Sequence, residues 1–119
     1  MVDKRIYEKL KELAQSGKII HYRELAILLG MPFETSDDRN KLYDKLYEIS
    51  RFEVKNKRPM LSILVVHEKS FDSSQMPGEG FFHLAKELGV WKGIGKNKFF
   101  SDEIRKVWEY WNKQRSTQV

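Results

Sequence analysis

The chain has 119 residues, which suits a single domain with a core large enough to fold without disulfides or metal ions. Hydrophobic residues make up 40% of the chain and charged residues 33%, a balance typical of soluble globular proteins and not of disordered ones. The absence of cysteine excludes disulfides, zinc sites built on cysteine and thiol nucleophiles.

The net charge is +5, and most of it lies near the C-terminus, where residues 91–119 hold seven Lys or Arg against three Asp or Glu. An excess of this kind favours an anionic partner such as nucleic acid, although a solvated basic surface would have the same composition. The first residues do not resemble a signal peptide, and the longest apolar run, within "MLSILVV", is too short to cross a bilayer. We therefore expect a cytoplasmic protein with no membrane partner.

Two helices are expected in the first thirty residues. The first spans Lys4–Gln15, where apolar residues recur at helical spacing, with Asp3 as its N-cap. A short extended segment at Ile19–Ile20 follows, and a brief helix then covers about Tyr22–Leu29. Gly30 supplies the stop signal of this second helix.

A third helix is predicted to run from the capping box of Thr35 and Asp38 to about Ser50. A polar turn and then a strand at Met60–His67 follow. This strand is apolar at nearly every position, so we expect both of its faces to be covered. The loop over residues 68–80 has the composition of a wing or flap.

The last forty residues predict two more helices separated by a basic loop. Gly80 opens a helix over residues 81–88, and Ser101 caps a helix over residues 102–114. Between them, "VWKGIGKNKFF" reads as a glycine-containing basic loop.

This order of elements predicts an α+β, mainly helical fold of the winged helix-turn-helix type with a C-terminal helical extension. We expect one domain over residues 1–119, with the core in residues 1–89 and the basic loop and last helix in residues 90–119. The helix that starts near Thr35 would then be the recognition helix.

Four blocks of the sequence follow the order of motifs in a known family. The first block, "GKIIHYRELAILLGMP", fits G-x-(I/V)-x-Y-x-x-L-A-x-x-x-G-x-P with one extra residue before the tyrosine. The second block is an arginine near the start of the next helix. The third is "RPMLSILVVHEK" and the fourth is "PGEGFFHLAKELG". The chain thereby resembles the DNA-binding domain of O6-alkylguanine-DNA alkyltransferases and of the catalytically dead alkyltransferase-like proteins, over about Ile6 to Gly89. The first block is matched by Gly17, Ile19 or Ile20, Tyr22, Leu25, Ala26, Gly30 and Pro32. The resemblance implies DNA binding by a winged helix.

Two departures from the family pattern remove its chemistry. Val66 stands where the family has its alkyl-accepting cysteine, and Glu68 replaces the arginine that follows the histidine. Because the chain has no thiol to accept an alkyl group, alkyl transfer is excluded. We therefore expect a distant, cysteine-free relative or a convergent look-alike that binds DNA without being an enzyme.

The resemblance also implies roles for two residues. Tyr22 would lie against the DNA backbone and help to turn out a nucleotide, and Arg39 would fill the gap that a turned-out base leaves. The competing interpretations are a packed tyrosine and an Arg39 that pairs with Asp37 or Asp38. Lysines on the third helix and in the basic loop add further candidates for phosphate contact. The predicted DNA-binding residues are Tyr22, Arg39, Lys41, Lys45, Lys96 and Lys98.

Other functions remain open. Acidic residues at the start of the third helix favour a winged-helix module that docks to protein. A hydrolase with His67 as its general base is a further alternative, and serines lie nearby in sequence at Ser62, Ser70, Ser73 and Ser74. However, the next residue, Glu68, would point to the opposite face of a strand and so could not easily orient His67. The three histidines have no metal-binding spacing, so we expect neither a metal nor another cofactor. The sequence leaves the oligomeric state open.

Overall fold

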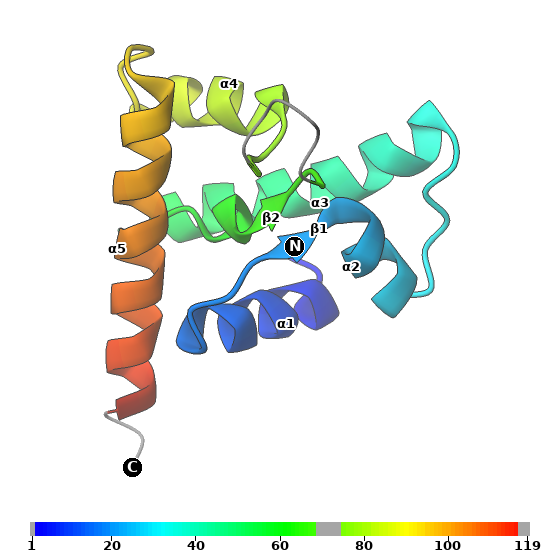
Figure 1. The fold of residues 1–119 in the computed structure, drawn as a ribbon, viewed down its shortest axis with the longest axis horizontal. Coiled ribbons are helices and arrows are strands. Elements are labelled where there is room, and N and C mark those ends of the chain that lie inside the picture. Colours follow the sequence, from blue (N-terminus) through cyan, green and yellow to red (C-terminus); the bar gives the residue numbers. More distant parts are fainter. Residues whose placement is uncertain (1, 69–74, 117–119) are drawn as a thin grey trace.

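The computed structural model describes residues 2–68 and 75–116, with side chains described as far as residue 113. This part of the chain is mainly helical, with five α-helices and a small two-stranded parallel sheet, as expected for an α+β fold (Figure 1). The elements are α1 (Lys4–Gln15), β1 (Ile20–His21), α2 (Tyr22–Leu28), α3 (Ser36–Lys55), a 3₁₀ helix η1 (Leu61–Leu64), β2 (Val65–Val66), α4 (Glu79–Glu87) and α5 (Lys96–Ser116).

The local signals in the first half of the chain are confirmed. The Asp3 carboxylate accepts the backbone N–H groups of Arg5 and Ile6, so it caps α1 as predicted. At α3, Thr35 and Asp38 form the expected capping box, in which each side chain accepts the other's backbone N–H. Each signal works within one helical turn and does not depend on the rest of the fold.

The strand predicted at Met60–His67 is wrong over most of its length. Leu61–Leu64 forms η1, and only Val65–Val66 pairs with β1, in a parallel register that sets Ile20 opposite Val65. An unbroken apolar run fits a buried helical turn as well as a strand, because it has no period. The expectation that both faces are covered is confirmed, since residues 61–66 are all buried.

A buried pair of serines helps to hold η1 in its helical shape. The backbone N–H of Ser62 donates to the Ser50 hydroxyl at 3.1 Å, and the two hydroxyl oxygens lie 2.6 Å apart. Ser50 belongs to α3, so this contact fastens η1 to the C-terminal half of that helix. Of the loop predicted as a wing, residues 69–74 lie outside the described residues.

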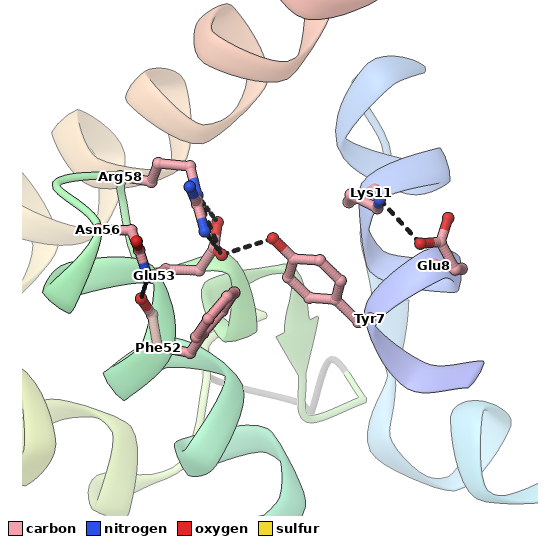
Figure 2. Close-up of polar contacts among 7 residues, drawn as sticks. All are labelled: Tyr7, Glu8, Lys11, Phe52, Glu53, Asn56 and Arg58. Carbon is pink, nitrogen blue, oxygen red and sulfur yellow. Dashed lines mark hydrogen bonds and ion pairs between the residues drawn. The ribbon is translucent and has the colours of Figure 1, made fainter. Parts of the chain in front are cut away.

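Helix α3 extends five residues beyond its predicted end, because the turn predicted at Glu53 is helical. The Glu53 side chain is fully buried, and its carboxylate accepts the Tyr7 hydroxyl at 2.7 Å (Figure 2). Arg58 donates through Nε and Nη2 to the same carboxylate at 3.0–3.2 Å. This two-pronged contact raises the pKa of Arg58 and ties α1, α3 and the following turn together.

Helix α5 starts six residues before its predicted start, so Lys96 and Lys98 lie on a helix and not in a loop. Phe99 holds this extra turn, because its ring stacks on Trp91 with centroids 5.5 Å apart and lies 6.3 Å from Phe81. Ser101 is therefore inside the helix and is not its cap. In the same region α4 covers Glu79–Glu87, close to its prediction.

One hydrophobic core joins the two ends of the described chain. It includes Ile6 and Leu10 from α1 together with Val107 and Trp111 from α5. Figure 1 shows α5 along one side of the molecule and α2 on the opposite side. Among the described residues, every helix is too short or too polar to cross a bilayer.

Lys57 ends α3 in a conformation that normally needs glycine. Its φ is +60°, and the N–H groups of Lys57 and Arg58 close the helix by donating to the carbonyls of Val54 and Glu53 at 3.0 and 2.8 Å. Replacing Lys57 by glycine is expected to raise the free energy of unfolding by about 1 kcal/mol, because glycine removes the left-handed strain. Urea unfolding measures the change. Lys57→Ala is the matched control, and an equal gain from alanine would contradict the explanation.

Candidate nucleic-acid interface

A cluster of rings lies where the two strands end. The parallel pairing of β1 with β2 brings Tyr22, the first residue of α2, beside His67, and their ring centroids are 4.8 Å apart. Tyr43 of α3 meets the Tyr22 ring edge-on at 5.2 Å, and Tyr47 continues the row at 6.3 Å from Tyr43. Segments far apart in the sequence therefore form one cluster of aromatic rings.

Tyr22 uses its hydroxyl within the protein. Its side chain is buried, and its oxygen accepts the backbone N–H of Gly78 at 2.9 Å. Burial also raises the pKa of Tyr22. These contacts match the interpretation of Tyr22 as a packed tyrosine, while its contact with DNA stays a prediction.

The burial of Tyr22 predicts a loss of stability at high pH. The folded-state pKa lies above the unfolded value, so the stabilisation is present below about pH 10 and is lost as the pH rises above it. Tyr22→Phe is expected to cost about 1 kcal/mol near neutral pH, where Gly78 loses its acceptor. The same change should reduce the decline above about pH 10 by up to about 1.4 kcal/mol per pH unit. Urea unfolding across this range measures both effects, and an unchanged alkaline slope would contradict the assignment.

A hollow opens next to the ring cluster, with a volume of about 280 Å³. Three of its wall residues are aromatic, one is basic and one is acidic. They are Tyr22, Arg23, Phe33, His67 and Glu68. Such a hollow admits a flat group beside a cation, and we call it the aromatic hollow.

Arg23 and Arg39 both contact Glu34. Arg23 lies 3.4 Å from the Glu34 carboxylate and over the Phe33 ring at 5.5 Å. Arg39 donates to the Glu34 backbone carbonyl at 3.1 Å and to the Ser36 hydroxyl at 3.3 Å. The guanidinium of Arg39 therefore bonds neither Asp37 nor Asp38. We refer to Arg23 and Arg39 as the arginine pair.

Arg23 is absent from the residues predicted from sequence. Its position immediately after Tyr22, at the start of a predicted helix, is the one feature of the sequence that could have indicated a role in binding. Its link to Arg39 through Glu34 depends on the path of the loop between α2 and α3, and this path cannot be predicted from the local sequence.

The exposed face of α3 is acidic at its centre. Residues two apart on a helix lie about 200° apart, so Arg39 and Lys41 are at opposite edges of this face. Asp37 and Asp44, both exposed, lie between those edges. Because carboxylates repel phosphate, the centre of this face is unfavourable for a DNA backbone.

The remaining predicted lysines are paired with acids. Lys45 lies 3.3 Å from the Asp3 carboxylate of the α1 cap. Lys96 lies 2.8 Å from Glu79 and Lys98 lies 3.0 Å from Asp102. Figure 1 shows that the start of α5 is beside α4 and away from the start of α3, so the structure does not bring Lys96 and Lys98 to the arginine pair.

His67 has an exposed side chain, and its backbone N–H donates to the Met76 carbonyl at 2.9 Å. Ser62 is not available as a nucleophile for His67, because its hydroxyl pairs with that of Ser50. The other serines considered, Ser70, Ser73 and Ser74, lie outside the described residues. In the described ranges, no three His, Asp or Glu side chains gather in a way that would hold a metal ion.

Comparisons with known proteins identify no relative: no family model, curated protein or solved structure matches the chain.

Proposed function

We propose that this chain is a non-enzymatic DNA-binding protein with a winged helix-turn-helix fold. The contact to the DNA backbone would come from the edge of α3 that carries Arg39, together with Arg23 from the start of α2. The observation that supports this most is that both members of the arginine pair contact Glu34, while Arg23 also lines the aromatic hollow. Arginine suits phosphate because its planar group donates two parallel hydrogen bonds.

The order of the elements supports the winged-helix part of the proposal. Helices α1, α2 and α3 are followed by β2, and β2 pairs with the short strand that precedes α2. In a helix-turn-helix protein the second helix of the motif enters the major groove with its first residues, and the corresponding helix is α3. The first turn of α3 and the loop before it hold the contacts of Arg39.

The distribution of charge restricts how DNA would lie on the protein. Asp37 and Asp44 disfavour phosphate at the centre of the exposed face of α3, so the proposed contact uses its two edges. The arginine pair supplies one edge. Lys41 supplies the other, with Lys45 further along, where it would have to leave Asp3 to reach phosphate.

The experiment is the binding of a fluorescein-labelled DNA duplex, followed by anisotropy as the salt concentration is raised. The logarithm of the binding constant should fall linearly with the logarithm of the salt concentration, with a slope of about −0.9 per phosphate contact. An equally charged heparin fragment serves as the comparison for general attraction to a polyanion. Absence of binding to duplex and single-stranded DNA at low salt would refute the proposal.

A second function, docking to another protein, is favoured by two exposed apolar residues on α2. Ile27 is 71% exposed and Leu28 is 59% exposed, although the other face of this helix is buried. Replacing both by serine, which adds no charge near Arg23, separates the alternatives. If the chain binds DNA, this variant should largely retain its affinity for the duplex. If the chain docks to a protein, this variant should lose a co-purifying protein. Substitution of the arginine pair should then leave the capture of that protein unchanged.

A further inference from the structure

A second and larger hollow, of about 500 Å³, lies at the other end of α3. The last turn of α3 and the segment after it form one wall, a stripe along α5 forms the other, and Val90 from the segment after α4 completes the lining. The lining residues are Val54, Lys57, Arg58, Pro59, Val90, Glu103, Lys106, Glu109, Tyr110 and Lys113. We call it the basic groove. Its volume is within the range of pockets that hold small organic ligands.

Lys57 is held at this groove at a cost to the fold. A left-handed conformation costs a residue other than glycine on the order of 1 kcal/mol, and strained positions of this kind cluster at binding sites. Among the described carboxylates, none lies within ion-pair distance of the Lys57 ammonium. No charge partner among the described residues therefore explains why lysine occupies the position.

Arg58 is fixed beside it. The buried Glu53 carboxylate holds Nε and Nη2, so the guanidinium cannot swing away from the wall of the groove (Figure 2). The side chain is still 21% exposed, and Nη1 has no hydrogen-bond partner among the described residues. A cation that is prepositioned and incompletely bonded is suited to an anionic ligand, because little side-chain freedom is lost on binding.

The opposite wall adds charge and a flat surface. Lys113 has no ion-pair partner in the described part of the chain, and Lys106 lies 3.9 Å from Glu103. The carboxylate of Glu103 is occupied, since it accepts the backbone N–H of Met60 at 3.0 Å. Tyr110 offers an aromatic ring, and Glu109 offers an acceptor for amino or hydroxyl groups.

We propose that the basic groove binds a small organic phosphate that carries a planar ring, such as a nucleoside monophosphate. Lys57, Arg58 and Lys113 bind the phosphate, and Tyr110 packs against the ring with the apolar residues of the wall. A phosphate monoester suits this wall because it accepts several charge-assisted hydrogen bonds at once.

This site is separate from the proposed DNA contact. Helix α3 has 20 residues and a length of about 30 Å, with Arg39 near its start and the groove at its last turn. The ligand would therefore bind without displacing DNA, and the inference does not depend on the proposed function.

The test is a titration of the ¹⁵N-labelled protein with adenosine 5′-monophosphate up to about 5 mM, a range that detects dissociation constants near 1 mM. Amide shifts should change in residues 54–58 and 103–113. Adenosine and inorganic phosphate should each bind at least about tenfold more weakly. No change in shifts, changes confined to other residues, or equal binding of inorganic phosphate would overturn the proposal.

The substitution Lys57→Gly makes the test more specific, because it removes the ammonium group while it is expected to stabilise the fold. Affinity for the nucleotide should fall about tenfold, and duplex binding should stay unchanged. Lys41→Gln, which removes one charge at the other end of the same helix, is the matched control and should leave nucleotide binding unchanged. Equal nucleotide affinity of Lys57→Gly and the wild type, or an equal loss in both variants, would overturn the assignment.

Discussion

Replacement of Arg58 by methionine is expected to lower the free energy of unfolding by about 3–5 kcal/mol. Methionine keeps the length and the apolar stem of the side chain but leaves the fully buried Glu53 carboxylate without its cation. A buried charge that loses its partner keeps the cost of leaving water and loses the attraction that offsets it. Urea unfolding near neutral pH measures the effect.

The double variant Glu53→Leu with Arg58→Met is the control for this prediction. It removes both charges, so no buried charge is left alone, and it should lose less stability than Arg58→Met. Tyr7 would still lose the acceptor that it reaches at 2.7 Å, which keeps the double variant below the wild type. If the free energy of unfolding of Arg58→Met lies within about 1 kcal/mol of the wild-type value, the contacts of Arg58 with Glu53 do not stabilise the fold as we describe.

Neutralising the arginine pair is expected to weaken duplex binding by about tenfold to a hundredfold at low salt. Arg23→Gln with Arg39→Gln removes the two cations that contact Glu34, of which Arg23 also lines the aromatic hollow, and the salt slope should become shallower by about 1.8. Anisotropy titrations at several salt concentrations measure the affinity and the slope together.

The matched control is Lys96→Gln with Lys98→Gln, which removes the same charge at the start of α5. These lysines were predicted to bind DNA, but they pair with Glu79 and Asp102 and lie away from the arginine pair. Their loss should change the affinity by less than about threefold, through the net charge alone. Equal losses from the two double variants would mean that the DNA attraction comes from overall charge and not from this site.

The elements that sequence predicted well are those specified within a few residues. The limits of α1, the Asp3 cap, the capping box of Thr35 and the stop at Gly30 all depend on side chains that act on their own helical turn. Their prediction required no knowledge of the tertiary fold.

The errors occur where distant contacts override the local pattern. The sequence predicts Glu53 in a polar turn, but its carboxylate is buried at the end of α3 by contacts with Tyr7 and Arg58. The apolar run that forms η1 has no period, so a buried serine pair decides its shape. In both cases a contact joins parts of the chain that the local pattern does not connect, Tyr7 with Glu53 and Ser50 with Ser62.

The candidate site was only partly accessible from sequence. Tyr22 and Arg39 were selected by the resemblance and by their places at helix starts, while the contribution of Arg23 depends on the loop that carries Glu34. The aromatic hollow likewise needs the parallel pairing of β1 and β2, which neither strand reports by itself.

The most direct test of the proposed DNA-binding function is a map of amide shifts in the ¹⁵N-labelled protein as a short DNA duplex is added. If the arginine pair forms the contact, the largest changes will lie at residues 22–24, 33–41 and 67–68. Largest changes at the start of α5 or in the basic groove, or no changes at low salt, would contradict it.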